Sequence, residues 1–107
     1  MTPRAAEVGP AARRDLDNHI LWLRGEADPE TASRFAQAAI QTFDKLAETP
    51  GLGPLLAAVN PQLADMRKWR VDGFRKILIF YQPHDDGIRV VRVLHSAADW
   101  WSLLDVN

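Results

Sequence analysis

The sequence contains no cysteine and no long apolar run. Without cysteine, neither a disulfide framework nor a thiolate metal site is available, and the chain is suited to a reducing compartment. The apolar stretches fall far short of the length that crosses a bilayer, and the N-terminus has no uninterrupted apolar signal region. We therefore expect a cytoplasmic protein with no membrane partner.

The sequence also has no large excess of charge of either sign, since 13 Lys and Arg residues stand against 14 Asp and Glu residues, for a net charge of -1. These totals demand no polyanionic partner. The cations are nevertheless concentrated in one stretch, between residues 67 and 92, which holds only three Asp residues. That stretch is suited to an acidic partner. Its cations are Arg67, Lys68, Arg70, Arg75, Lys76, Arg89 and Arg92.

A first helix is predicted between Ala11 and about Arg24. Pro10 is suited to the opening of a helix, and Gly25 is a plausible stop. Residues 1–8 can form only a brief strand at a sheet edge. Apolar side chains recur at helical spacing at Leu16, Ile20 and Leu23.

A longer second helix is predicted to begin at Asp28 and to end before Pro50. The Asp28 carboxylate can accept backbone N–H groups of the first turn, while Pro29 stands where no donor is needed. Residues 55–64 then form a connector with room for one helical turn. The apolar face of the helix should hold Ala32, Phe35, Ala39, Phe43 and Leu46, flanked by Ala36, Ile40 and Ala47.

The C-terminal half has the pattern of β-strands. Residues 66–71 alternate in polarity, Asp72-Gly73 is a turn signal, and residues 74–81 and 88–94 are rich in apolar β-formers. The polar segment 82–87 predicts a second hairpin. Both later strands are apolar on two faces. We therefore expect helices on one face and the C-terminal segment, or a partner, on the other.

The order of these elements predicts an α+β fold. An N-terminal helical hairpin should pack on a small antiparallel β-sheet, and Ser96 should cap a short C-terminal helix that runs to Leu104. With 107 residues, 47% of them hydrophobic, the chain can bury one modest core and is too short for two ordinary domains. We expect a single domain over residues 1–107.

Two titratable residues near the C-terminus invite a chemical reading. His95 can act as a general acid or base near neutral pH, but we favour a structural role in which it ends a strand and forms a local hydrogen bond. Asp99 is expected to cap the last helix or to pair with Arg92 or Arg75. The other two histidines, His19 and His84, should lie at the surface. The three histidines together are not expected to bind a metal.

The four tryptophans divide into two pairs. Trp100 and Trp101 are adjacent, and neighbouring residues of a helix point about 100° apart. We therefore expect one of them in the core and the other partly exposed, where it offers a large contact area to a partner. Trp22 and Trp69 are expected in the core or on a sheet face.

Five segments of the chain, taken in order and spacing, resemble the RelE/ParE toxin superfamily of bacterial toxin-antitoxin systems, and within it the ParE-like plasmid stabilisation proteins. The resemblance implies a toxin without a cofactor, neutralised by a small ParD-like antitoxin whose C-terminal segment wraps it. The five segments are PAARRDL (10–16), DPETA (28–32), LAETPGLG (46–53), MRKWRVDGFRKILIFY (66–81) and IRVVRVLHSAADWWSLL (88–104).

The resemblance leaves the mode of action open. RelE-like members cut messenger RNA on the ribosome, whereas ParE-like members inhibit DNA gyrase without an established catalytic centre. Arg75 matches a phosphate-binding arginine of the RelE pattern, but Ser96 and Ser102 stand where those nucleases have an arginine and a tyrosine. Because both replacements remove the expected chemistry, we favour gyrase inhibition by protein binding. The alternatives are a ribosome-dependent endonuclease that uses Arg75 and His95, and a degenerate toxin that only binds its antitoxin.

The expected functional surface is cationic and aromatic, and it should contact the target or the antitoxin as a binding face rather than as a catalyst. Its cations either solvate an exposed sheet face or meet an acidic antitoxin segment. Ala97 and Ala98 stand where many ParE-like chains have arginines, so the basic character of the C-terminal patch is weakened. Nucleic acid is expected as a partner only indirectly. The expected surface residues are Arg67, Arg70, Arg75, Arg92, His95, Asp99, Trp100 and Trp101.

Overall fold

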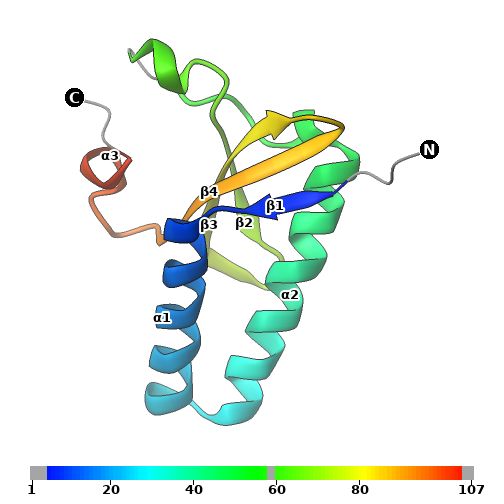
Figure 1. Ribbon diagram of the computed structural model, residues 1–107. Coiled ribbons are helices and arrows are strands. Elements are labelled where there is room, and N and C mark those ends of the chain that lie inside the picture. Colours follow the sequence, from blue (N-terminus) through cyan, green and yellow to red (C-terminus); the bar gives the residue numbers. More distant parts are fainter. Residues whose placement is uncertain (1–4, 58–59, 105–107) are drawn as a thin grey trace.

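The computed structural model describes residues 5–57 and 60–104 and has an α+β architecture. A helical hairpin lies beside a small sheet, and a short helix follows the last strand (Figure 1). The expected fold class is confirmed. In chain order the elements are β1 (Ala6–Val8), α1 (Pro10–Glu26), α2 (Pro29–Glu48), β2 (Arg67–Val71), β3 (Phe74–His84), β4 (Gly87–His95) and α3 (Trp100–Leu103).

The sheet is mixed, with the strand order β1-β4-β3-β2. The three consecutive strands β2, β3 and β4 pair antiparallel, as expected. β1 occupies an edge but pairs parallel with β4, so the expectation of a purely antiparallel sheet was wrong in this respect. The long stretch of chain between β1 and β4 allows this, because parallel strands need a long connection rather than a tight turn.

The two hairpin turns differ from each other. Gly73 has a φ of 82°, in the region that favours glycine, at the predicted turn between β2 and β3. The second turn is shorter than expected, because β3 continues through Pro83 to His84 and leaves only two residues before β4. β2 pairs with β3 no further than Tyr81, so Pro83 stands on a free edge, where its missing N–H costs no hydrogen bond.

The helix boundaries follow their capping residues. The Asp28 carboxylate accepts the N–H of Thr31 at 2.6 Å, as predicted, and this hydrogen bond lowers the pKa of Asp28. Gly25 does not end α1, which continues to Glu26 and closes where the N–H of Ala27 donates to the carbonyl oxygen of Leu23. A glycine without a following left-handed turn costs helix stability but does not end the helix.

The buried face of α2 differs from the prediction at two positions. Ile40 is 59% exposed, whereas Thr42 is fully buried. The hydroxyl of Thr42 donates to the carbonyl oxygen of Ala38 at 2.7 Å and accepts the N–H of Asp72 at 3.1 Å. A polar residue can occupy the core here because both hydrogen-bonding functions of its hydroxyl are used. The predicted apolar positions Ala32, Phe35, Ala39, Phe43 and Leu46 are buried.

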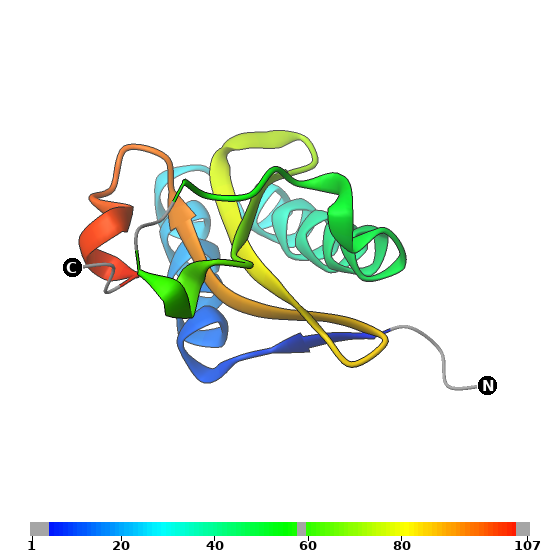
Figure 2. The same cartoon turned by 90° about the horizontal axis from the view of Figure 1, so that it is seen from above.

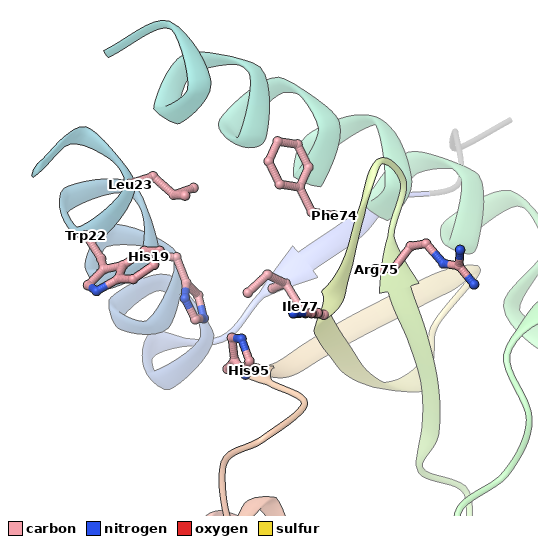
Figure 3. Close-up of a pocket in the computed structure, with 8 residues that line it drawn as sticks. His19, Trp22, Leu23, Phe74, Arg75, Ile77 and His95 are labelled. Atoms are coloured by element: carbon pink, nitrogen blue, oxygen red, sulfur yellow. The ribbon is translucent and has the colours of Figure 1, made fainter. Parts of the chain in front are cut away.

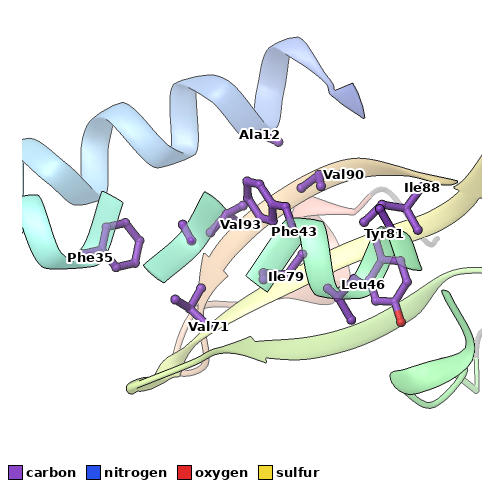
Figure 4. Packing of buried hydrophobic residues seen from close by; sticks show 12 residues of the cluster. Ala12, Phe35, Phe43, Leu46, Val71, Ile79, Tyr81, Ile88, Val90 and Val93 are labelled. Carbon is purple, nitrogen blue, oxygen red and sulfur yellow. The ribbon is translucent and has the colours of Figure 1, made fainter. Parts of the chain in front are cut away.

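The main core lies between the helical hairpin and one face of the sheet (Figure 4). A smaller cluster covers the opposite face, where the connector and the C-terminal segment lie next to each other (Figure 2). This confirms the expected cover of both faces. The whole segment between α2 and β2, which we call the connector from here on, holds the short helical turns η1 (Pro50–Leu52) and η2 (Pro61–Leu63), of which only the second was expected. The smaller cluster is formed by Leu56, Leu63, Met66, Phe80, Leu94 and Leu104.

Candidate functional site

Helix α1 is fastened to the edge of β4 by side chains. β1 pairs only with residues 88–90, so the rest of β4 lacks a neighbouring strand on this side. Asp15 and His19 lie one turn apart on α1, and both contact the backbone of Val93. The Asp15 carboxylate accepts the N–H of Val93 at 2.9 Å, and Nε2 of His19 lies 2.8 Å from the carbonyl oxygen of Val93. The two side chains replace the hydrogen bonds of a missing strand. His19 is therefore half-buried, and its expected surface position was wrong.

Arg92 connects three elements of the fold. Its Nε and Nη2 donate to the Asp15 carboxylate at 2.7 and 3.0 Å, and the two side chains are only 22% and 11% exposed. This hydrogen bonding raises the pKa of Arg92. Its Nη1 donates to the carbonyl oxygen of Leu103 at 3.0 Å. Arg92 thus joins β4, α1 and α3, and its guanidinium is engaged within the fold rather than free for a partner.

The chain around α3 differs from the expectation for its cap. Asp99 directly precedes the helix, but its carboxylate accepts the hydroxyl of Ser102 at 2.8 Å instead of a backbone N–H. In the part of the chain that the structure describes, Asp99 forms no ion pair with an arginine. Ser96 does not cap α3, because the helix begins at Trp100 and its N-cap position is Asp99. The backbone N–H of Ser96 instead continues the β3–β4 ladder to the carbonyl oxygen of Lys76.

The two C-terminal tryptophans occupy different environments. Trp100 packs against the smaller cluster, with its ring 5.3 Å from that of Phe80, while Trp101 stacks on Trp100 at 4.3 Å and is 38% exposed. The predicted division between an inner and a partly exposed tryptophan is confirmed. Trp69 packs on the main core from the sheet, as expected. Trp22 is 64% exposed, so its expected place in the core was wrong.

A cleft of about 630 Å³ opens between α1, the tip of the β2–β3 hairpin and the end of β4. Trp22 borders it because, at about 100° per residue, this position lies off the face that Leu16, Ile20 and Leu23 turn to the core. Leu21, beside it, is also 61% exposed. The apolar residues that line the cleft are Trp22, Leu23, Phe74 and Ile77. The helical period of α1 was the signal that could have placed Trp22 at the surface.

The polar side chains of the cleft point in different directions. His95 ends β4 at an exposed position, and its Nδ1 accepts the N–H of Ala97 at 3.0 Å, which confirms the predicted local bond. Figure 3 shows His95 on the side of His19, while the guanidinium of Arg75 points away from both. Nε2 of His19 is engaged by the backbone of β4. Arg75 and His95 therefore do not direct their polar groups at a common point.

The remaining expected cations also have distinct environments. Arg67 donates from Nη1 to the carbonyl oxygen of Gly53 at 2.7 Å and holds the connector. Arg70 places its guanidinium 4.9 Å from the ring of Trp69. Among residues 5–57 and 60–104, neither Arg70 nor Arg75 is part of an ion pair. Lys68 and Lys76 share this property and were not among the expected site residues.

Two further properties concern metals and membranes. Within the described ranges, no group of three or more His, Asp or Glu side chains is placed to hold a metal ion. The helices of the same ranges are all too short or too polar to cross a bilayer.

Comparison with known proteins identifies the class of this fold. A solved structure named "Chromosomal ParDE TA system from P. aeruginosa" matches with a TM-score of 0.69 over 87% of this chain and 96% of that chain, at 15% identity. Toxin RelE3 of Caulobacter vibrioides is 29% identical over 94 residues, which cover 87% of this chain and 95% of the relative. The fold is that of the RelE/ParE superfamily of toxins.

The family follows from a match over most of the chain. The family model for the "ParE toxin of type II toxin-antitoxin system, parDE" matches residues 7–100. The chain therefore belongs to the ParE toxin family of type II toxin-antitoxin systems. The matched range begins within β1, includes β2, β3, β4 and both long helices in full, and ends at the first residue of α3.

Proposed function

We propose that this toxin inhibits DNA gyrase by binding to it. The observation that carries this proposal is the chemistry of the cleft beside α1: its lining is largely apolar, and the polar groups of Arg75 and His95 are not directed at one point. Acid–base chemistry on RNA needs a proton-transfer group and charge-stabilising groups around one reacting atom. An apolar cleft with an exposed tryptophan at its border is better suited to binding a protein.

The proposed physiological partner is a ParD-like antitoxin encoded beside the toxin. Membership in the ParE family and the similarity to a ParDE system support such a partner. The cleft offers apolar surface next to the cations of the hairpin tip, which suits an amphipathic segment with acidic residues. Of the residues expected at the binding surface, we retain Arg70, Arg75, His95 and Trp101 as direct contacts. Trp100 would support Trp101 through the stacking of their rings, and Asp99 would do so from the residue before α3.

The test uses purified components and one matched pair of variants. The protein should inhibit supercoiling by gyrase and leave ribosome-bound messenger RNA intact. Trp22→Ala should weaken the inhibition, whereas Leu21→Ala should not, because both residues are exposed on α1 but only Trp22 lines the cleft. Cleavage of messenger RNA on ribosomes with no effect on gyrase would overturn the proposal.

A ribosome-dependent endonuclease is the second candidate, and one observation favours it. His19, Lys76 and His95 line the same cleft, so a proton-transfer group and a cation are at least neighbours there. In that case His95→Ala should abolish cleavage. A degenerate toxin that only binds its antitoxin is a further possibility, and expression without an antitoxin separates it from both toxic mechanisms, since the cells would then grow normally.

A further inference from the structure

Two imidazoles lie at the β4 end of the cleft beside α1. Nε2 of His19 contacts the carbonyl oxygen of Val93 at 2.8 Å, and His95 follows Val93 by two positions on β4. Residues two apart on a strand face the same side of the sheet, so His95 lies on the side that Val93 turns to the helices. Both histidines line the cleft, and Figure 3 shows their rings as neighbours.

The hydrogen bonds of the two rings indicate where their protons are. A carbonyl oxygen only accepts, so His19 donates to Val93 from Nε2, and Nδ1 of its neutral ring is an acceptor. In His95 the Nδ1 accepts the N–H of Ala97, so the proton is on Nε2. Among residues 5–57 and 60–104, these two remaining nitrogens have no hydrogen-bond partner. The pair therefore offers one acceptor and one donor to a ligand.

The acceptor nitrogen of His19 is accessible. In the same described ranges, the one enclosed side-chain nitrogen or oxygen without a partner belongs to Trp69, so Nδ1 of His19 is not enclosed. The wall beside the two histidines is apolar, and the volume of about 630 Å³ is in the range of ligand sites. A matching ligand has a large apolar body and one polar group that both donates and accepts. A phenol has this chemistry, because its hydroxyl does both and its ring buries a large apolar area.

We propose that the cleft receives a tyrosine side chain of the protein that it binds. The inference rests on the proposed function only for the identity of that protein, which is gyrase. The tyrosine hydroxyl donates to Nδ1 of His19 and accepts from Nε2 of His95, while its ring packs against the apolar wall. A phenylalanine in its place leaves both nitrogens unpaired where water is excluded, so the cleft distinguishes the two side chains. Each bond is neutral and is a small part of a whole interface.

A nucleobase is a poorer occupant than a phenol. Its edges carry further donors and acceptors, and burying them against an apolar wall without partners is costly. That wall consists of Trp22, Leu23, Phe74 and Ile77. The guanidinium of Arg75, which would suit a phosphate, points away from the two histidines (Figure 3). The polar groups of the cleft thus match one hydroxyl better than a nucleotide.

The test titrates the purified full-length protein with three capped, uncharged amino acids and follows it by NMR. The probes are N-acetyltyrosine amide, N-acetylphenylalanine amide and the O-methyl ether of the tyrosine probe. The tyrosine probe should bind about fivefold tighter than the other two, because one lacks the hydroxyl and the other lacks the proton that reaches His19. The indole N–H signal of Trp22 should shift on binding. Equal affinities of the tyrosine and phenylalanine probes contradict the proposal.

A matched pair of variants assigns the preference to the cleft. His95→Phe keeps a ring but removes the donor, so the preference for the tyrosine probe should fall to within about twofold. His84→Phe should keep the full preference, since His84 lies at the opposite end of β3 from Phe74 and outside the cleft. A preference that survives His95→Phe, or that is lost in His84→Phe, overturns the proposal. Tighter binding of uridine than of the tyrosine probe assigns the cleft to a nucleobase instead.

The outcomes for this inference and for the proposed function are separate, because none of the probes contains gyrase. A protein that prefers the tyrosine probe but leaves gyrase active overturns the proposed function alone. A protein that inhibits gyrase without this preference overturns the tyrosine site alone.

Discussion

The two edges of the sheet differ in whether an arginine is paired with an acidic side chain. Beside β4, α1 brings the Asp15 carboxylate to Arg92, and the pair closes an edge that β1 does not reach. Beside β2, none of the carboxylates in residues 5–57 and 60–104 forms an ion pair with Arg70, and the hydrogen bonds between β2 and the preceding connector end at Lys68. Both arginines lie on strands. What separates a structural from an available cation is therefore the neighbouring element, which in one case supplies an acid and in the other does not.

The largest effect should come from breaking the closed side. Arg92→Ala leaves the Asp15 carboxylate, which is 11% exposed, without its partner. Because a nearly buried charge without a partner is costly, the free energy of unfolding should fall by about 3 kcal/mol. Urea denaturation measures this. Arg70→Ala is the matched variant on the open side, where the loss should stay within about 0.5 kcal/mol. Equal losses in the two variants would contradict the division between the two sides.

A double-mutant cycle refines this first comparison. Removing both partners, in Asp15→Ala with Arg92→Ala, leaves no uncompensated charge, although the N–H of Val93 also loses its acceptor. The double variant should therefore lose less stability than the sum of the two single variants. Simple additivity would show that the 2.7 Å contact between Arg92 and Asp15 carries no coupling energy.

The second effect concerns the exposed apolar side of α1. Trp22→Ala should leave the free energy of unfolding nearly unchanged, because the side chain is 64% exposed. Binding to the proposed gyrase target should weaken by about 2 kcal/mol, which is roughly thirtyfold, as is typical for a tryptophan at the centre of an interface. Titration of gyrase inhibition measures this, with Leu21→Ala as the control. A loss of stability rather than of affinity in Trp22→Ala would contradict this prediction and indicate that Trp22 packs in the core.

A smaller effect is expected at Tyr81, which holds the connector that closes half of the β2 edge. Its hydroxyl accepts the N–H of Gly53 at 2.9 Å and donates to the carbonyl oxygen of Pro50 at 2.8 Å. Tyr81→Phe leaves a buried N–H without an acceptor and should cost about 1–2 kcal/mol in urea denaturation. Hydrogen exchange at Lys68, whose N–H donates to Pro54, should also become faster. Unchanged hydrogen exchange at Lys68 would show that Tyr81 does not stabilise the pairing between the connector and β2.

The same residue gives a pH dependence that can be assigned without ambiguity. Burial raises the pKa of Tyr81 above its ordinary value of 10.0, and it is the one tyrosine in the sequence. The folded state therefore holds the phenolic proton more tightly than the unfolded state. This contribution to stability is complete below pH 10 and is lost as the pH rises through the raised value. Phenolate absorbance should appear at higher pH in the folded protein than in urea. Coincident titrations would contradict the burial.

The sequence predicted those features that depend on local patterns. Asp28 and Pro29 marked the start of α2, Asp72-Gly73 marked a hairpin, and the two apolar faces of the later strands predicted cover on both sides. These signals act over a few residues, so they can be recognised without knowing the fold. The resemblance to ParE-like toxins agreed with them.

Those features that depend on contacts between distant segments were not predictable in the same way. Asp15 and Arg92 are 77 positions apart, and nothing near either residue indicates that they form a pair. The parallel pairing of β1 with β4 and the engagement of His19 by Val93 are of the same kind. Four of the candidate surface residues prove to be engaged within the fold, because burial and pairing decide availability: Arg67, Arg92, Asp99 and Trp100.

The smallest effect is expected at His95, where the two candidate mechanisms differ most. The residue is exposed and the hydrogen bond of its imidazole is local, so His95→Ala should change the free energy of unfolding by less than about 0.5 kcal/mol. A binding toxin should keep most of its inhibition of growth, because His95 only borders the cleft. A nuclease that used this imidazole for proton transfer would instead lose about a hundredfold or more of its rate. Growth arrest after controlled expression, with soluble yield as the control, distinguishes the two, and a harmless His95→Ala protein of normal stability would favour catalysis over binding.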